Sequence, residues 1–373
     1  MNKTIGIFGG GQLGRMMAQA ALPLNIQCTF FEANKNCPSA ILGSVFSNKD
    51  AQGLQDFIAS ADVFSLEFEN TPVADVDILT QSKTLYPPRL ALATAQNRLA
   101  EKGLFDELNI PVAPYRAVDS LESLKQAVTD LGLPIVLKTV TGGYDGKGQF
   151  VLRSEDQIDT AWAELGPAKS LIAESFVKFS REVSIIAVRG QNGDVKTWAL
   201  AENHHHNGIL SHSIVPAPNS ADLQPVAQDY ITRLLNHLNY VGVLTLELFV
   251  TEQGLYANEM ACRVHNSGHW SIEGAICSQF ENHIRAVAGL PLGSTDVVRP
   301  TVMVNIIGEH PKSEEVLALK GAHLHLYNKS ERVGRKLGHI TLMPNDPNEL
   351  TALCRQLASI LPVPLALTTD MVL

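Results

Sequence analysis

Residues 244–270 read LTLELFVTEQGLYANEMACRVHNSGHW, and the predicted fold depends on this stretch. Two β-rich runs, 243–250 and 255–260, flank a three-residue loop that ends in a glycine suited to a positive φ angle. In this hairpin Glu247 is expected directly opposite Glu259. Like charges that face each other on a sheet are destabilising, so the pair predicts a cation between them, and two carboxylates suit Mg²⁺.

The alternative is a solvated hairpin with two unrelated surface acids, since a register slip of one residue would separate the pair. The residues that follow favour a site. Gly268 permits close approach of the backbone to a ligand, and a dense polar cluster is costly to fold unless a ligand uses it. The cluster consists of Arg263, His265, Asn266, Ser267, His269 and Trp270.

Length and composition exclude several classes of protein. At 373 residues the chain is long enough for two or three domains. No apolar run reaches the roughly 18 residues of a membrane span, and no signal peptide pattern opens the chain, so we expect a cytoplasmic protein without a membrane partner. A net charge of −9 without a Lys/Arg block argues against nucleic acid. The five cysteines lack CxxC spacing, which predicts buried thiols.

The first 32 residues read as a strand at 3–8, a glycine turn at 9–14, a helix, and a strand at 27–31 that ends beside Glu32. This spacing matches the dinucleotide-binding fingerprint and, taken alone, predicts a nicotinamide-dependent dehydrogenase. The turn guarantees only a helix N-terminus open to an anion, however, and several α/β families use it without that cofactor. With a further strand at 62–68, these elements predict a small βαβ domain.

A second domain is expected after one helical run at 89–108 and the proline-rich break that follows it. A helix at 121–131 leads into a predicted β-hairpin, PIVLKTVTGGYDGKGQF at 134–150, whose tip holds four glycines around Lys147. The N–H groups of such a tip can cradle phosphate, and Lys138 supplies a point charge. The alternative is a mobile surface hairpin.

Polar residues interrupt the strands that follow. Glu174, within a strand at 171–177, is suited to an adenine amino group, and Glu182 to a ribose. The histidines at 204–206 would point to alternate faces of an extended backbone, and no metal-ligand spacing is near. We therefore expect a loop that brings His205 to a ligand, rather than a metal site.

The C-terminal region reads as short strands and a closing helix at 349–361. Segments 323–329 and 332–340 predict a basic hairpin whose turn has a geometry fit for one phosphate group, with a solvated basic turn as the alternative. The cations around Gly334 are Arg332, Arg335 and Lys336.

Together these motifs resemble the N5-carboxyaminoimidazole ribonucleotide synthetases, a family of the ATP-grasp superfamily. The resemblance spans nearly the whole chain, and its most specific parts are GGYDGKGQ at 142–149 and RVHNSGHW at 263–270. The chain departs from the family at Cys262, where the family usually has Pro. This difference affects the expected rigidity of the local backbone and the expected inertness of the Cys262 thiol.

The resemblance implies an ATP-grasp fold of the α/β and α+β class with three domains, and a homodimer. The domains are an N-terminal Rossmann-like (pre-ATP-grasp) domain at 1–94, a central lid domain with a glycine-rich flap at 95–180, and a C-terminal domain at 181–373. A small closing subdomain is expected at 300–373.

The resemblance also assigns residues. Mg²⁺ is assigned to Glu247 and Glu259. Nucleotide binding is assigned to Arg98, Lys138, Gly143, Tyr144, Asp145, Gly146, Lys147, Gly148, Gln149, Glu174, Ser175, Phe176, Val177, Glu182, His205, Asn258 and Glu259. For catalysis we expect Arg263, as the holder of bicarbonate, with Lys138, Tyr144, Asp145 and His265. For the acceptor substrate we expect Asn266 and Ser267, with Lys329, Arg335 and Lys336 on its 5′-phosphate.

The implied reaction joins ATP, bicarbonate and 5-aminoimidazole ribonucleotide, through carboxyphosphate, to give the N5-carboxy product, ADP and phosphate in purine synthesis. Phosphoryl transfer depends on positioning and charge neutralisation, which accounts for metals, Lys138 and a flap without a Ser/His/Asp triad. Three alternatives stay open at this point: a nicotinamide-dependent dehydrogenase, a non-catalytic ATP sensor, and an ATP-grasp relative that uses formyl phosphate or ligates an amino acid.

Overall fold

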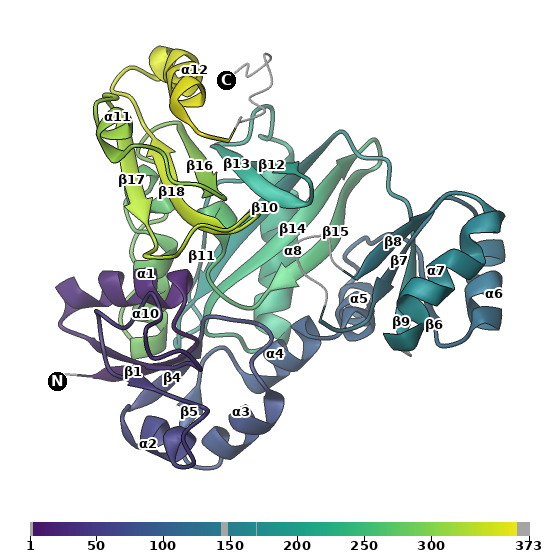
Figure 1. Ribbon diagram of the computed structural model, residues 1–373, viewed down its shortest axis with the longest axis horizontal. Coiled ribbons are helices and arrows are strands. Elements are labelled where there is room, and N and C mark those ends of the chain that lie inside the picture. The colour runs from purple at the N-terminus through teal and green to yellow at the C-terminus, as the bar shows by residue number, and fades with distance from the viewer. Residues whose placement is uncertain (1–2, 143–147, 169, 364–373) are drawn as a thin grey trace.

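The computed structural model describes residues 3–142, 148–168 and 170–363, which form three β-sheets (Figure 1). The first sheet is parallel, with the order β3-β2-β1-β4-β5. Its strands are β1 (Thr4–Phe8), β2 (Gln27–Phe31), β3 (Val45–Phe46), β4 (Val63–Leu66) and β5 (Thr84–Leu85). Its helices are α1 (Gln12–Ala21), α2 (Gly53–Ala59) and α3 (Val73–Thr80). The predicted strand, glycine turn and helix at the N-terminus are confirmed.

The single helix predicted at 89–108 is wrong, because the chain forms two helices there. These are α4 (Arg89–Ala95) and α5 (Arg98–Glu107). Asn97 lies between them, and its side-chain oxygen accepts hydrogen bonds from the backbone N–H groups of Leu99 at 3.0 Å and Ala100 at 3.1 Å. This N-cap satisfies the first donors of a new helix, which hydrophobic periodicity alone does not reveal.

A four-stranded sheet with the order β6-β9-β7-β8 forms the lid at the right of Figure 1. Its strands are β6 (Tyr115–Val118), β7 (Ile135–Thr139), β8 (Gln149–Leu152) and β9 (Leu171–Ser175), and its helices are α6 (Leu121–Leu131) and α7 (Ile158–Leu165). Lys138 pairs with Gln149 across β7 and β8, which confirms the predicted hairpin. The tip of the hairpin, residues 143–147, lies outside the described residues. The lid has a hydrophobic core of its own.

The largest sheet is antiparallel and follows the order β15-β14-β10-β12-β13-β16-β18-β17, with β11 paired to β10. Its strands are β10 (Arg181–Arg189), β11 (Val195–Thr197), β12 (Ala201–His206), β13 (Ile209–Val215), β14 (Gly242–Thr251), β15 (Gly254–Ala261), β16 (Thr301–Ile307), β17 (Ala322–Leu326) and β18 (Lys336–Leu342). The associated helices are α8 (Leu223–His237), α9 (Ser271–Gly274), α10 (Gln279–Ala288), α11 (Ser313–Leu317) and α12 (Leu350–Ile360).

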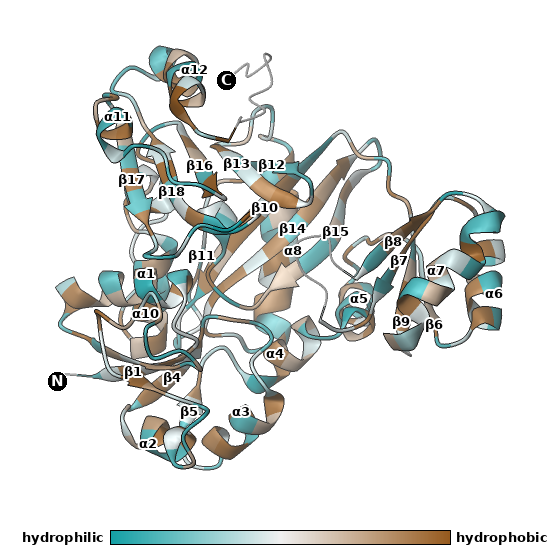
Figure 2. Cartoon of the chain, viewed as in Figure 1, coloured by the Kyte–Doolittle hydropathy of each residue, from teal (hydrophilic) through white to brown (hydrophobic). Residues whose placement is uncertain are grey.

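Alternate residues of β10 pack into different cores, as the period of two along a strand requires. Val183, Ile185 and Ala187 belong to the core that contains α8, whereas Ile186 and Val188 belong to the core that contains α1 and α10. Both cores also include residues of the first sheet. Figure 2 shows the result as hydrophobic strands in the centre of the molecule. The first and largest sheets are therefore joined by shared apolar packing.

The hairpin of β14 and β15 places Glu247 opposite Glu259, which confirms the predicted register. The predicted three-residue loop is wrong, because the loop holds two residues and Gly254, at φ +115°, already belongs to β15. A β-bulge adds Asn258 to β15 between the pairs on either side of it. The loop is one residue shorter than predicted, and the bulge adds one residue to β15. The two carboxylates therefore still face each other.

Two further predictions concern hairpins. The loop expected at 204–206 is wrong, because these residues end β12 and turn through Asn207 and Gly208, both with positive φ, into β13. An Asn-Gly pair with positive φ at both positions is the preferred two-residue hairpin turn. The basic hairpin is confirmed as β17 and β18, and the closing helix as α12.

All five cysteines are buried and free, which confirms the prediction of buried thiols. Within the described ranges, no helix is long and apolar enough to cross a membrane.

Candidate active site

Lys138 and Glu174 meet on neighbouring strands of the lid, β7 and β9, with Nζ and Oε2 3.1 Å apart. Lys102 of α5 approaches the same oxygen at 3.6 Å. Burial raises the pKa of Glu174, but the two lysines outweigh burial and the pKa is lowered. Its second oxygen is buried without a hydrogen-bond partner among the described residues. An unsatisfied buried acceptor is costly, and a ligand N–H group would satisfy it.

The predicted nucleotide residues after Glu174 continue from β9 toward β10. The backbone N–H of Ser175 donates to Pro114 O at 2.8 Å, and that of Phe176 donates to Pro134 O at 3.1 Å. The side chain of Phe176 is exposed, while Val177 is half-buried. These contacts fix the connection between the lid and the largest sheet. Gln149 begins the return strand β8 and Gly148 lies in the turn before it, whereas Gly143, Tyr144, Asp145, Gly146 and Lys147 lie outside the described residues.

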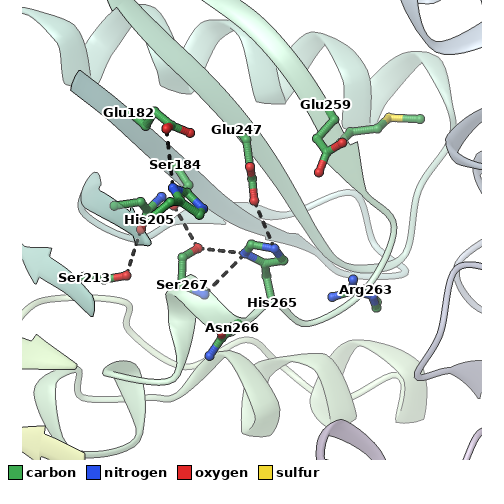
Figure 3. Close-up of polar contacts among 12 residues, drawn as sticks. Glu182, Ser184, His205, Ser213, Glu247, Glu259, Arg263, His265, Asn266 and Ser267 are labelled. Carbon is green, nitrogen blue, oxygen red and sulfur yellow. Dashed lines mark hydrogen bonds and ion pairs between the residues drawn. The ribbon is translucent and has the colours of Figure 1, made fainter. Parts of the chain in front are cut away.

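Glu182 of β10 and His205 of β12 lie side by side, with Oε1 and Nδ1 3.4 Å apart (Figure 3). A β-bulge between His204 and His205 accompanies this arrangement. Burial lowers the pKa of His205, but the hydrogen bond to Glu182 and the negative charges of Glu182 and Glu247 together outweigh burial, so the pKa is raised. The pair therefore combines an acceptor and a donor, which suits the hydroxyl groups of a sugar.

The facing carboxylates are each held by one cationic or polar neighbour. His265 Nε2 lies 3.1 Å from Glu247 Oε1, and Arg98 Nη1 donates to Glu259 Oε2 at 3.1 Å. Burial raises the pKa of Glu247, but His265 and the nearby charges, that of Lys336 among them, hold it at about 2. Glu247 is therefore ionised at neutral pH.

The carboxylate pair has oxygen atoms that could serve Mg²⁺. One oxygen of Glu247 and one of Glu259 have no protein partner in the part of the chain that the structure describes. Carboxylate oxygens are the ligands that Mg²⁺ prefers, and this ion commonly completes its shell with phosphate oxygens and water. No group of three or more His, Cys, Asp or Glu side chains suited to a metal occurs among the described residues. The pair therefore fits an ion shared with phosphate better than a site closed by protein.

Arg263 lies beside the carboxylate pair and forms a two-bond ion pair with Glu69, which follows β4. Nε and Nη2 donate to the two carboxylate oxygens, the latter at 2.8 Å, and Nη1 donates to Val264 O at 3.1 Å. Burial raises the pKa of Glu69, but Arg263 outweighs it and holds the pKa at about 2. Three of the five guanidinium N–H groups are thus used. Among the described residues, one N–H of each terminal nitrogen has no hydrogen-bond acceptor and can serve a planar anion.

The basic turn lies against the N-terminal domain. Lys329 Nζ donates to the side chain of Gln12, the first residue of α1, and Arg335 Nη1 donates to Ser330 Oγ at 2.9 Å. Burial and then the charge of Arg335 lower the pKa of Lys329 to about 8. The charge of Lys336 lowers the pKa of Glu247, so this turn also borders the carboxylate pair.

The glycine turn of the N-terminal domain is filled by the Glu67 carboxylate. Its oxygens accept from Gly11 N at 2.6 Å and from Leu13 N at 3.2 Å. A Cβ atom at Gly11 would lie 2.3 Å from Glu67 Oε1, so the glycine is needed for this close approach. Burial raises the pKa of Glu67 to about 7. Because the carboxylate uses the N–H groups that a dinucleotide phosphate would need, the turn does not favour NAD(P) binding.

Comparison with known proteins decides the family. Residues 1–96 match the ribonucleotide synthetase preATP-grasp domain, 103–280 the ATP-grasp domain, and 301–353 the phosphoribosylaminoimidazole carboxylase C-terminal domain. The N5-carboxyaminoimidazole ribonucleotide synthase of Pseudomonas aeruginosa is 45% identical over 350 residues, which cover 93% of this chain and 96% of the relative. The synthase of Bacillus subtilis is 43% identical and covers 93% of each chain. The chain belongs to the N5-carboxyaminoimidazole ribonucleotide synthase family.

Solved synthase structures share the fold along nearly the whole chain. The enzyme of Thermus thermophilus has a TM-score of 0.92 at 45% identity, covering 96% of this chain and 99% of its own. The synthase of Aspergillus clavatus, in complex with ADP and 5-aminoimidazole ribonucleotide, has a TM-score of 0.89 at 29% identity and covers 96% and 98%. The expected ATP-grasp fold with its pre-ATP-grasp domain is therefore confirmed.

Glu101 and Lys102 of α5 support the ATP side of this synthase fold. Neither was predicted from the sequence as a site residue. Lys102 Nζ donates to Asn258 O at 2.8 Å and lies 3.4 Å from Ala257 O, while Glu101 Oε1 accepts from Met260 N at 2.7 Å. Both side chains are buried, and burial raises the pKa of Glu101 to about 8. They cover the edge of β15 at its bulge. The sequence signal that could have identified these two residues is their charge on the core-facing side of a predicted helix.

Two of the expected acceptor residues have buried partners. Asn266 and Asn305 form a reciprocal pair of amide hydrogen bonds at 3.0 and 2.8 Å. Ser267 is fully buried and bonds to His265 and Ser184. This arrangement favours support of His265 over direct contact of the Ser267 side chain with a substrate.

Proposed function

We propose that the chain carboxylates 5-aminoimidazole ribonucleotide with ATP and bicarbonate, giving N5-carboxyaminoimidazole ribonucleotide, ADP and phosphate in the synthesis of IMP. The observation that carries the proposal is the position of two groups of cations around one carboxylate pair. Arg98 bonds to Glu259 on the side of the lid, and the charge of Lys336 acts on Glu247 on the side of the basic turn. Two anionic substrates can therefore meet at this pair.

On the nucleotide side, Lys138 supplies a positive charge for the phosphates of ATP, and the unpaired oxygen of Glu174 is suited to the adenine amino group. Glu182 and His205 are assigned to the ribose. We assign Mg²⁺ to Glu247 and Glu259, where it would neutralise negative charge on the phosphates that are transferred. The flap residues Tyr144 and Asp145 keep the roles that the family resemblance implies.

On the bicarbonate side, the two terminal N–H groups of Arg263 are assigned to the planar anion. A bicarbonate oxygen attacks the γ-phosphorus, the bond to ADP breaks, and carboxyphosphate forms. The amine of the acceptor then attacks the carboxyl carbon, loses a proton, and phosphate leaves. Because carboxyphosphate reacts with water, the site must exclude solvent until the amine attacks.

On the acceptor side, Lys329, Arg335 and Lys336 are assigned to the 5′-phosphate, and Asn266 to a polar group of the same substrate. ATP already has Lys138, so a second anionic substrate needs cations of its own in a chain of net charge −9. We retain as proposals the domain limits 1–94, 95–180 and 181–373, with a closing subdomain at 300–373. We also propose a homodimer and a cytoplasmic location.

A phosphate-release assay tests the function. ATP, Mg²⁺ and bicarbonate should give rapid release only when 5-aminoimidazole ribonucleotide is present, with one carboxylated product for each ADP. Release that requires formate or an amino acid in place of bicarbonate would identify a different ATP-grasp ligase. ATP binding without release under any of these conditions would identify a sensor. Either of these results would overturn the proposal.

A further inference from the structure

The side chains of Asn266 and Asn305 form a closed pair of hydrogen bonds beside the candidate site. Asn266 follows His265 in the polar cluster (Figure 3). Asn266 Nδ2 donates to Asn305 Oδ1 at 3.0 Å, and Asn305 Nδ2 donates to Asn266 Oδ1 at 2.8 Å. Asn305 is buried in β16, whereas Asn266 is half-buried. Because a buried amide is costly unless its hydrogen bonds are made, the partner of each N–H group in this pair matters.

The amide pair links the two regions assigned to the bicarbonate and to the acceptor. Asn266 comes three residues after Arg263, which is assigned to bicarbonate. Asn305 lies two residues before Ile307, and Ile307 pairs with Lys336 of the basic turn across β16 and β18. The pair therefore joins the segment that holds Arg263 to the strand beside the cations assigned to the acceptor phosphate.

A backbone carbonyl fixes the orientation of the Asn305 amide. Two amides paired in this way would be equally well bonded to each other if both were turned over. Asn305 Nδ2, however, also donates to the carbonyl oxygen of Leu210 at 2.8 Å. A carbonyl oxygen can only accept, so a turned Asn305 would place two oxygens against each other. Leu210 therefore sets the orientation of Asn305 independently of Asn266.

The orientation of the Asn266 amide follows from that of Asn305. Both N–H groups of Asn305 are used, one on Leu210 and one on Asn266. If Asn266 alone turned over, nitrogen would face nitrogen and oxygen would face oxygen. Within the part of the chain that the structure describes, Asn305 is the only hydrogen-bond partner of the Asn266 side chain. Asn305 therefore decides which end of the Asn266 amide points toward the site.

One donor of Asn266 is left for a ligand. An amide nitrogen carries two hydrogens, and Asn305 accepts only one of those on Asn266. The second N–H has no acceptor among the described residues. A carbonyl oxygen often leaves one of its two lone pairs unused, whereas an unpaired N–H group is rarer in folded proteins. Because Asn266 is only half-buried, a ligand atom can reach this N–H.

We propose that Asn305 is a positioning residue, which fixes the Asn266 amide so that an N–H donor, rather than a carbonyl oxygen, faces the acceptor substrate. The substrate atom that meets this donor is then a hydrogen-bond acceptor, such as a hydroxyl oxygen or an unprotonated ring nitrogen. A site built around a donor rejects a ligand that presents another donor, because both N–H groups would be left unpaired. The contact with substrate rests on the proposed function, whereas the orientation of the two amides is a property of the free protein.

Neutron diffraction from crystals of the free protein, exchanged into D₂O, measures the orientation directly. The method locates deuterium and so separates an amide nitrogen from an amide oxygen. We expect two deuterons on Asn305, directed at Leu210 and at Asn266, and one deuteron of Asn266 directed away from the pair. An Asn305 nitrogen turned away from Leu210, or an Asn266 oxygen in place of the free donor, would overturn the proposal without any variant having to fold.

A substitution at Asn305 tests the effect on the substrate. Asn305→Leu has a similar volume but leaves the Asn266 amide without its partner. We expect the KM for the acceptor to rise about 2- to 10-fold, the typical contribution of one neutral hydrogen bond, while the KM for ATP stays nearly constant. If Asn305→Leu does not fold, Asn305→Ala removes the same amide and leaves space for water.

Asn282→Leu is the matched control. Asn282 is also a buried amide that donates to a backbone carbonyl, that of Gly293 at 3.2 Å, but it lies in α10 and bonds to no residue assigned to a substrate. This variant should lose stability and keep both KM values. If Asn305→Leu likewise lost stability with an unchanged KM for the acceptor, the amide pair would have a structural role only, and the proposal would be overturned.

A double variant shows whether Asn305 acts through Asn266. Asn266→Ala removes the donor itself and should raise the KM for the acceptor at least as much as Asn305→Leu. In the Asn266→Ala background, Asn305→Leu should raise this KM no further, because both changes remove the same contact. Additive effects, or an unchanged KM in Asn266→Ala, would overturn the positioning role. A wild-type protein that carboxylates no acceptor would refute the proposed function, while the diffraction experiment would still decide the orientation of the amides.

Discussion

Glu259 is the residue whose charge the metal assignment depends on most directly. Glu259→Gln keeps the volume of the side chain but removes its negative charge opposite Glu247 and its ion pair with Arg98. We expect ATP turnover to be abolished. The loss of a facing like charge adds stability of a few tenths to about 1 kcal/mol, which the lost ion pair offsets.

Phosphate release and thermal melting check this prediction together. Glu252→Gln, at the exposed turn of the same hairpin, is the control and should behave as wild type. Normal phosphate release by Glu259→Gln would refute the assignment of Mg²⁺ to this pair.

Arg335 tests the assignment of the acceptor phosphate. Arg335→Ala removes a guanidinium that Ser330 holds in place. Losing a charged hydrogen bond to phosphate costs about 1.5–3 kcal/mol, so the KM for 5-aminoimidazole ribonucleotide should rise on the order of ten- to a hundredfold. The KM for ATP should change little, and Lys312→Ala, an exposed cation elsewhere, should change neither. A loss of ATP affinity in Arg335→Ala would move the turn to the nucleotide site.

The raised pKa of Glu67 predicts that the free energy of unfolding depends on pH. Its pKa is raised from 4.5 to about 7 in the folded protein, so the folded state keeps a proton that the unfolded state loses in this range. The stabilisation is complete below about pH 4.5 and is lost as the pH rises through about 7, amounting to roughly 3 kcal/mol. Glu67→Gln lacks this titration.

Denaturant unfolding of wild type and Glu67→Gln between pH 4.5 and 8 measures this effect. The free energy of unfolding of wild type, relative to the variant, should fall as the pH rises to about 7 and then level off. Parallel curves would show that Glu67 titrates normally in the folded protein.

At the scale of single elements, α5 is expected to support the nucleotide side of the site. Lys102→Met should raise the KM for ATP, because it frees the bulge at Asn258 and removes one cation from Glu174. Stability should fall by about 1–3 kcal/mol, the usual cost of a lost buried hydrogen bond. The KM for the acceptor should stay nearly constant.

Lys83→Met is the matched control for α5. Lys83 also donates to a backbone carbonyl, that of Ala61 at 2.8 Å, but it lies in the N-terminal domain away from β15. Its variant should lose some stability and keep both KM values. If Lys102→Met melted earlier with an unchanged KM for ATP, α5 would have a structural role only.

The elements also show which parts of the site could be predicted from sequence. The hairpin of β14 and β15 depends on local turn and strand signals, so the pairing of Glu247 with Glu259 was predicted correctly although the loop length was not. By contrast, the contacts of Glu69 with Arg263 and of Lys102 with Asn258 join residues 194 and 156 positions apart. Such contacts arise only when elements far apart in the sequence pack together, and no local pattern encodes them.

At the scale of the whole molecule, the lid differs from the remainder. Its apolar core contains residues of the lid alone, whereas two of the three cores that include residues of the largest sheet also include residues of the N-terminal domain. The N-terminal domain and the largest sheet therefore hold the acceptor side and the carboxylate pair in one packed body. The lid joins that body at the site through polar groups such as Glu174 and Lys102. This division suits an enzyme that must close over ATP and then exclude water.

The central claim is that bicarbonate is activated by phosphorylation before it meets the amine. If the γ-phosphoryl group passes to a bicarbonate oxygen, that oxygen leaves with phosphate when the amine attacks the carboxyl carbon. With ¹⁸O-labelled bicarbonate, mass spectrometry of the products should therefore find one labelled oxygen in each phosphate released, together with the carboxylated ribonucleotide. Carboxylated product accompanied by phosphate without ¹⁸O would contradict the account.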